Sequence, residues 1–361
     1  MKLDRRFLAS ANAILMLSWL APVSLVRAAD EPKHTKIVAI EGKNWEADQV
    51  DYPIQIVCHK GAGKDDAKDV FLGDNVRDDF GDVRFSDGKQ PLDYWLESST
   101  PGKEAVFWVK VPNIPRNGRS ALNVHFGHPD LKTTSNGKKV FRFFDDFPGN
   151  YSGLNNENVP SGWVNTLKSQ NEYQRWIVSG GIIQFKGSGH LTTKNKVWPN
   201  PAKETYTLRF RAMWPDPAFR NAVENALSIG GTSLETTDGN CYMDIVGMYQ
   251  PLHGQKTVAS FGICAGTDPI KNFDTNKDLK PFSKSFKGSY LTYEIERKPQ
   301  ETLTRIIEAR EELRSDNVIK DDMYLMIHGC HFDQPDSPSI SLNFMLLRKQ
   351  AYPNPSYGEW K

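Results

Sequence analysis

The sequence shows almost no charge imbalance, few cysteines and few long apolar runs, and each scarcity excludes a class of protein. Its 45 basic and 44 acidic residues leave a formal net charge of +1, so its charge gives no reason to expect nucleic-acid binding. The charged residues are interspersed, as is typical of solvated strand faces. The apolar stretch over residues 11–26 is too short, and too often interrupted by polar residues, to predict a membrane span.

The first 29 residues have the pattern of a cleavable export signal. Lys2, Arg5 and Arg6 precede the apolar stretch, and the small residues Ala28 and Ala29 follow it. This order predicts cleavage after residue 29 and a secreted, periplasmic or cell-surface protein without a membrane span after cleavage. Paired arginines occur in both general secretory and twin-arginine signals, so both export routes stay open.

The chain contains only four cysteines, and all of them follow the predicted signal. Cys241 and Cys264 flank a predicted hairpin around residues 251–254, where they could form a cross-strand disulfide. The alternative is that both are free and buried. Cys58 and Cys330 fall in different predicted domains, and two unpaired small hydrophobic residues explain them more simply than a bridge.

Alternation of apolar and polar residues dominates the rest of the chain and predicts an all-β protein. The pattern is clear over residues 54–58, 105–111 and 122–126, and again over residues 206–214, 291–295 and 340–346. A chain of 361 residues exceeds the usual size of a single domain. We therefore predict two β-sandwich domains, over residues 30–140 and 141–361. The acidic residues 64–79 are expected to form a long loop with at most one short helix.

Three motifs in the first half carry a family resemblance. They are an Asp-Val-Arg-Phe strand at residues 82–85, a Tyr-Trp-Leu-Glu-Ser strand at 94–98 and a Trp-Val-Lys-Val-Pro strand at 108–112. Together they resemble an uncharacterised domain family found in secreted and envelope proteins, notably fused to proton-channel proteins of the MotA/TolQ/ExbB type.

The Phe-Phe-Asp-Asp-Phe sequence at residues 143–147 resembles the hinge by which such domains lead into a concanavalin A-like jelly roll. Arg348 and Lys349, with prolines at 353 and 355, resemble the end of that jelly roll. The resemblance implies that the second sandwich is related to lectins and glucanases. In such a chain residues 301–314 would form a strand, although their composition also suits a helix. We expect a strand.

The resemblance raises the question of catalysis. Glucanases of this fold carry Glu-x-Asp-x-(x)-Glu on one strand, but the only Glu-x-Asp here, at residues 46–48, lies in the predicted first domain. Glu294 and Glu296 share one face of a predicted strand and could act as acid and base. The simpler interpretation is that they are exposed and balance Arg209 and Arg211 across the sheet. The sequence therefore favours a noncatalytic protein.

Sugar binding requires exposed rings and hydrogen-bonding side chains. Trp198 lies beside two prolines, and Tyr249 is close to a turn that contains His253. We expect these three residues, with Arg209 and Arg211 from the polar strand face, to be candidates for ligand binding.

Jelly rolls of the resembled kind often hold structural calcium between the first and last strands. The resemblance places such a site at Asp145, Asp146 and Asn343, whose side chains offer the oxygen ligands that calcium prefers.

Together these features predict an exported, noncatalytic, lectin-like protein that binds a polysaccharide or other glycan. A protein-interaction or sensor component of the envelope, with another envelope protein as partner, is the first alternative. A polysaccharide-degrading glycosidase or lyase is the second.

Overall fold

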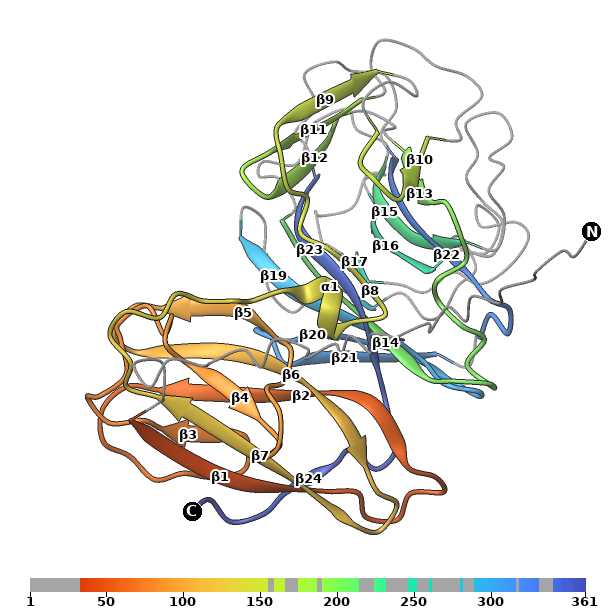
Figure 1. The fold of residues 1–361 in the computed structure, drawn as a ribbon. Coiled ribbons are helices and arrows are strands. Elements are labelled where there is room, and N and C mark those ends of the chain that lie inside the picture. Colours follow the sequence, from red (N-terminus) through yellow and green to blue (C-terminus); the bar gives the residue numbers. More distant parts are fainter. Residues whose placement is uncertain are drawn as a thin grey trace, which may run out of the picture.

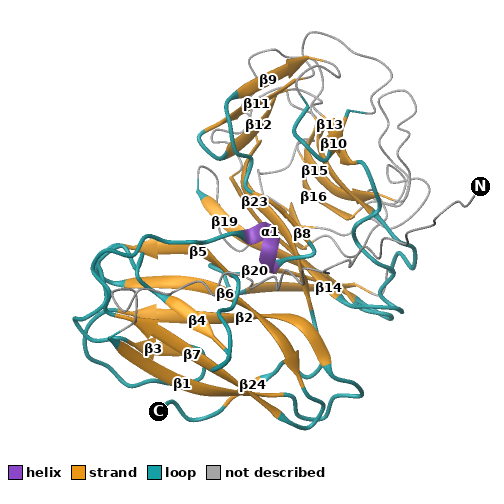
Figure 2. Cartoon of the chain, in the orientation of Figure 1, coloured by secondary structure: helices purple, strands orange, loops and turns teal. Residues whose placement is uncertain are grey.

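The computed structural model describes residues 33–154, 159–165, 175–186, 190–213, 224–231, 246–251, 260–261, 280–281, 289–315, 318–330 and 340–361. The predicted export signal lies outside these residues. Strands dominate the described chain, and its α-helix, α1 (Gly137–Val140), has a single turn (Figure 2). The all-β prediction is therefore confirmed. No helix in the described ranges is both long enough and apolar enough to cross a membrane.

The first sandwich consists of two four-stranded sheets (Figure 1). One sheet has the order β24 (Ser356–Tyr357), β1 (His34–Glu41), β7 (Arg119–Phe126), β4 (Arg84–Ser86). The other has the order β3 (Asp69–Phe71), β2 (Gln49–His59), β6 (Glu104–Ile114), β5 (Tyr94–Thr100).

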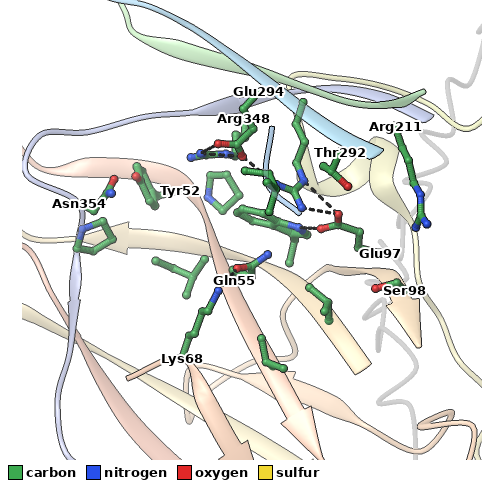
Figure 3. A pocket seen from close by; sticks show the side chains of 18 of the residues that line it. Tyr52, Gln55, Lys68, Glu97, Ser98, Arg211, Thr292, Glu294, Arg348 and Asn354 are labelled. Carbon is green, nitrogen blue, oxygen red and sulfur yellow. Dashed lines mark hydrogen bonds and ion pairs between the residues drawn. The ribbon is translucent and has the colours of Figure 1, made fainter. Parts of the chain in front are cut away.

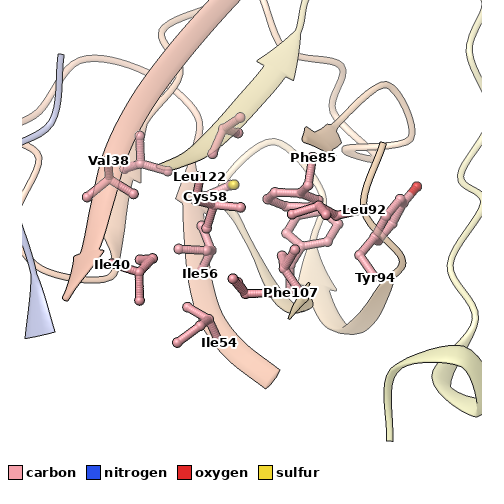
Figure 4. Close-up of a cluster of buried hydrophobic side chains, with 14 of the residues drawn as sticks. Val38, Ile40, Ile54, Ile56, Cys58, Phe85, Leu92, Tyr94, Phe107 and Leu122 are labelled. Carbon is pink, nitrogen blue, oxygen red and sulfur yellow. The ribbon is translucent and has the colours of Figure 1, made fainter. Parts of the chain in front are cut away.

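Alternating side chains from these sheets form a closed apolar core (Figure 4). Ile54, Ile56 and Cys58 point inward from β2, and Phe107 packs against them from β6. Cys58 is a free cysteine, as expected, and its complete burial raises the pKa of its thiol far above the ordinary value. It therefore acts as a small core residue rather than a reactive thiol.

The second sandwich contains a seven-stranded and a nine-stranded sheet. The former has the order β10 (Trp163–Val164), β13 (His190–Thr193), β22 (Tyr324–Cys330), β15 (Glu224–Gly231), β16 (Val246–Pro251), β17 (Ser260–Phe261), β18 (Lys280–Pro281). The latter has the order β21 (Glu311–Ser315), β20 (Thr302–Ile306), β19 (Tyr290–Arg297), β14 (Tyr206–Met213), β23 (Ile340–Lys349), β12 (Ile182–Lys186), β11 (Arg175–Ser179), β9 (Tyr151–Leu154), with β8 (Phe143–Asp145) also paired to β23.

Residues 301–314 form strand β20 and most of β21, an antiparallel pair. The strand expectation is confirmed, because Ile306 is buried in the core of the second sandwich while its neighbour Arg305 forms ion pairs on the other face. The predicted loop over residues 64–79 is wrong in one respect, since it contains β3, which pairs in parallel with β2. Three residues are too few to show an alternating pattern in the sequence.

The last residues of the chain return to the first sandwich. Strand β24 pairs with β1, the indole of Trp45 donates to the carbonyl of Pro353 at 2.7 Å, and the hydroxyl of Tyr357 donates to the carbonyl of Gln55 at 2.7 Å. The division at residue 140 stays a prediction, but this segment packs with the first core rather than the second.

A separate apolar cluster joins the two sandwiches. Its members are aromatic or aliphatic residues of β5, β6, β23 and the 140–144 segment: Trp95, Trp108, Val140, Phe141, Phe144, Phe344 and Leu346. The ring of Trp95 meets that of Phe344 edge-on at 5.1 Å between centroids. The aromatic run at residues 141–144 is therefore part of an interface that holds one sheet against the other.

Candidate functional site

A pocket of about 520 Å³ lies next to this cluster, between the two sandwiches (Figure 3). Tyr52 and Gln55 of β2 line one wall, together with residues of β5 and β6. Strands β14, β19 and β23 form the opposite wall. Volumes of this size are typical of sites for small ligands.

The polar wall exists because apolar and polar side chains alternate along strand β14 of the second sandwich. Leu208 and Phe210 of β14 point into the core, so Arg209 and Arg211 point the other way, toward the first sandwich. Arg209 lies directly opposite Glu294 of β19 in the strand register. The predicted polar face is thus present, but the first sandwich covers part of it.

Arg209 is the centre of a buried ion-pair network. Its guanidinium is 2.6 Å from a carboxylate oxygen of Glu97 in the first sandwich and 2.9 Å from one of Glu294 in the second. The three side chains expose only 7–8% of their surface. A buried arginine needs such partners, because an unpaired charge in this position would be strongly destabilising.

Trp108 connects the network to the first sandwich. Its indole N–H donates to Glu97 at 2.6 Å, and the guanidinium carbons of Arg209 and Arg348 lie 5.7 and 5.4 Å from its ring centre. Cation–π contacts of this kind strengthen when they are shielded from water. The network therefore fixes the orientation of the two sheets on either side of the pocket.

Glu294 is held as an anion. Burial raises the pKa of its carboxyl, but Arg348 and Arg209 outweigh that effect and lower the pKa to about 2. Arg348 donates to both carboxylate oxygens, at 3.2 and 3.3 Å. A carboxyl group in this state cannot donate a proton near neutral pH.

Both carboxylate oxygens of Glu296 also have hydrogen-bond partners. Arg305 donates to it at 2.9 Å, and the hydroxyl of Tyr352 donates to its other oxygen. Glu294 and Glu296 expose only 5% and 1% of their surface. The expectation that both are exposed is wrong, because the first sandwich and the C-terminal segment cover this part of β19.

Of the other predicted sugar-binding residues, Trp198 does not line the pocket. Trp198 is buried, with 1% of its surface exposed, and stacks beneath the guanidinium of Arg297 at 4.9 Å. Its expected exposure is wrong, since its ring packs in the core of the second sandwich. Tyr249 lies in β16, but its side chain and all of His253 are outside the described part of the chain.

The residues proposed to hold calcium make other contacts. Asp145 accepts hydrogen bonds from the indole of Trp163 at 2.7 Å and from the backbone N–H of Phe147 at 2.8 Å. Asn343 donates to the carbonyl of Gly181 at 3.0 Å, and Asp146 is exposed. No cluster of three His, Cys, Asp or Glu side chains suited to a metal occurs among the residues that the structure describes. The calcium site stays a prediction.

Cys241 and Cys264 lie outside the described residues, so their disulfide also stays a prediction. The hairpin expected between them is partly visible, because β16 and β17 pair in antiparallel fashion. Glu97, Trp108 and Arg348 are site residues that the sequence pattern did not predict. All three belong to motifs of the family resemblance, and their outward position on alternating strands was the available signal.

Comparison with known proteins adds a partial family match. A model described as "Domain of unknown function (DUF2341)" matches residues 79–166. This range contains the three strand motifs and the aromatic hinge. No curated protein is detectably similar in sequence.

Several solved structures resemble part of the chain at low identity. An endo-1,3-beta-glucanase from Streptomyces sioyaensis is 14% identical, with 57% of this chain and 95% of that one covered and a TM-score of 0.38. Peanut lectin is 8% identical, covering 56% and 97%, with a TM-score of 0.38. The carbohydrate recognition domain of Emp47p is 11% identical, covering 56% and 95%, with a TM-score of 0.39. At these TM-scores the likeness carries no conclusion about a ligand or a reaction.

Proposed function

We propose that this protein binds a carbohydrate, without cleaving it, in the pocket between the two sandwiches. The observation that carries the proposal is the composition of the pocket wall. Hydrogen-bonding side chains of both sandwiches, including Gln55, Ser98, Arg211 and Thr292, surround one open volume. Sugar hydroxyls both donate and accept hydrogen bonds, and such a mixed wall satisfies both roles.

The carboxylates of the pocket support binding rather than hydrolysis. A glycosidase needs one carboxyl group with a raised pKa that protonates the leaving oxygen. Glu294 has the opposite shift, and Glu97 is occupied by Trp108 and Arg209. Glu308 accepts hydrogen bonds from the backbone and side chain of Thr292 at 2.8 Å. Glu97 and Glu294 thus serve to hold arginines in place, and Glu308 serves to hold Thr292.

A glycan array tests the proposal, with a variant that fills the pocket. Ser98 is exposed and lines the pocket, whereas its neighbour Ser99 is exposed but does not line it. Ser98→Trp is expected to abolish binding to any glycan that the unmodified protein retains. Ser99→Trp adds the same bulk beside the pocket and is expected to leave binding unchanged.

Two outcomes would overturn the proposal. The first is no binding above background to any glycan class, which would favour the protein-interaction alternative. The second is release of reducing ends from a bound polysaccharide, which would favour the enzyme alternative.

We further propose that the protein acts outside the cytoplasm. The basic start, the apolar stretch and the small residues at 28 and 29 support this location. N-terminal sequencing of protein recovered from the exported fraction should then begin at Asp30. Retention of Met1 in that fraction would contradict cleavage.

A further inference from the structure

A second pocket, of about 460 Å³, lies on the same seam between the sandwiches. Both pockets are lined by Pro53 of β2. They flank the point where β2 approaches β23, at which the ammonium of Lys349 donates to the carbonyl of Val50 at 3.4 Å. In Figure 1 the single-turn helix α1, which lines the second pocket, lies at the junction of the two sandwiches.

Cationic side chains dominate the wall of this second pocket. They come from four separate parts of the chain: β6, α1, the segment after α1, and the end of β23. The five cations are Lys110, Lys138, Lys139, Arg142 and Lys349. Val140, Phe141 and Tyr206 add an apolar surface.

These charges are only loosely compensated. Asp93 lies 3.9 Å from Lys110 and 3.5 Å from Lys139, and Glu204 lies 3.7 Å from Arg142. These separations exceed ordinary hydrogen-bond lengths, in contrast with the 2.6 and 2.9 Å pairs of Arg209 in the first pocket.

Two of the lysines have no carboxylate partner in the described chain. No carboxylate there lies within ion-pair distance of Lys138 or Lys349, although Asp51 also lines the pocket. Among the charged residues that line the pocket, five are cations and one, Asp51, is an anion. Asp93, Glu204, Asp145 and Asp322 lie near these cations and compensate part of their charge.

Arg142 makes two contacts within the protein besides its ion pair with Glu204. Its guanidinium lies 5.2 Å from the centre of the Tyr206 ring, and its Nε donates to the carbonyl of Val197 at 3.0 Å. These contacts restrict its side chain before any ligand arrives, which lowers the entropy lost on binding.

From this geometry we propose that the second pocket binds a phosphate group. A phosphate monoester carries about −1.5 to −2 charges at neutral pH, so it is complementary to a lining with five cations and one anion. Lysine ammonium groups bind phosphate as point charges and need no planar alignment, unlike the paired contacts of guanidinium with carboxylate. The phosphate could be free or attached to a sugar. This inference does not depend on the proposed carbohydrate binding in the first pocket.

Calorimetric titration of the full protein at low ionic strength, with three probes, tests the inference. The probes are inorganic phosphate, glucose 6-phosphate and glucose. Both phosphate probes are expected to bind and glucose is not. Tighter binding of glucose 6-phosphate would identify a phosphorylated sugar as the source, and tighter or equal binding of inorganic phosphate would identify the free ion.

Paired variants locate the site. Lys138 is exposed and Lys349 half-buried, so the double change Lys138→Gln with Lys349→Gln should leave the fold intact. Loss of two charge-assisted contacts is expected to weaken phosphate binding at least about tenfold. The double change Lys89→Gln with Lys103→Gln, at exposed positions of the first sandwich outside the pocket, removes the same charge; it is the matched control and should bind normally.

The inference is wrong if neither phosphate probe binds, or if the double variant binds as tightly as the unmodified protein. It is also wrong if the control with Lys89→Gln and Lys103→Gln weakens binding as much as the change at Lys138 and Lys349, because that would indicate diffuse attraction to the surface. A thermal unfolding midpoint that is unchanged in the double variant excludes loss of the fold as the cause of weaker binding.

Discussion

At the scale of single residues, Arg209 determines how the two sandwiches meet. It pairs with one carboxylate from each sandwich. The alternation of side chains along β14 places it on the face of the sheet opposite the core. The sequence predicted that Arg209 and Glu294 would balance each other across the sheet. It could not predict Glu97 as the third partner, because that contact joins residues far apart in the chain and depends on how the two sandwiches pack.

Arg209→Ala should strongly destabilise the protein, because it leaves Glu97 and Glu294 less compensated in a buried site. We expect the free energy of unfolding to fall by about 3–5 kcal/mol in chemical denaturation. Arg314→Ala removes an arginine whose ion pairs with Glu301 and Glu312 are solvent-exposed, and it should change stability little. Equal effects of the two substitutions would contradict the structural importance of the network.

The low pKa of Glu294 predicts acid sensitivity. The folded pKa of about 2 lies below the ordinary value of 4.5, so the ionised carboxylate stabilises the fold above about pH 4.5. That stabilisation should be lost progressively as the pH falls from about 4.5 toward 2. Denaturation across this range should show a shallower pH dependence for Glu294→Gln than for the unmodified protein. Glu46→Gln, at an exposed position, is the control and should retain the original slope.

At the scale of elements, sequence alternation predicted long strands well and short ones poorly. Residues 206–213 and 290–297 alternate over several positions, and both are strands of the nine-stranded sheet. Strands β3 and β24 have three and two residues, too few for a period to be visible. Their pairing depends on contacts with β2 and β1 that no local pattern encodes.

The C-terminal segment should stabilise the first sandwich. Deletion of residues 351–361 removes β24, the hydrogen bonds between Ile37 and Lys361, and the packing of Ala351, Tyr357 and Trp360 on the first core. We expect amide hydrogen exchange to accelerate at least about tenfold at the amides of β1 that face β24. The deletion leaves β1 paired only with β7, at the exposed edge of its sheet. Exchange in β14, within the second sandwich, serves as the internal control and should change much less.

At the scale of the whole molecule, the apolar cluster and the ion-pair network couple the two sandwiches. Trp95 packs against Phe141, Phe144 and Phe344, at centroid distances of 5.6, 5.0 and 5.1 Å. The sequence predicted two sandwiches and a hinge, but it gave no sign that the aromatic hinge residues would be buried between them. An aromatic run suits a core as well as an interface, and only the folded arrangement distinguishes the two.

Trp95→Ala should uncouple the sandwiches. We expect the unmodified protein to unfold in one calorimetric transition and the variant to unfold in two, with a loss of about 3–5 kcal/mol at the interface. Ile37→Ala is a suitable control, because Ile37 is 41% exposed and belongs to β1 of the first sandwich, outside the apolar cluster between the two. A single transition in the Trp95 variant would show that the cluster is not what makes the sandwiches cooperative.

The pairing of β24 with β1 has a consequence for biogenesis. Strand β1 is synthesised near the start of the chain, but its outer partner is made only after the entire second sandwich. Until the C-terminal segment has been synthesised, the outer edge of β1 therefore has no partner strand. Nascent chains with such an edge are prone to intermolecular strand addition, so periods of high expression should place this protein among the clients of holding chaperones.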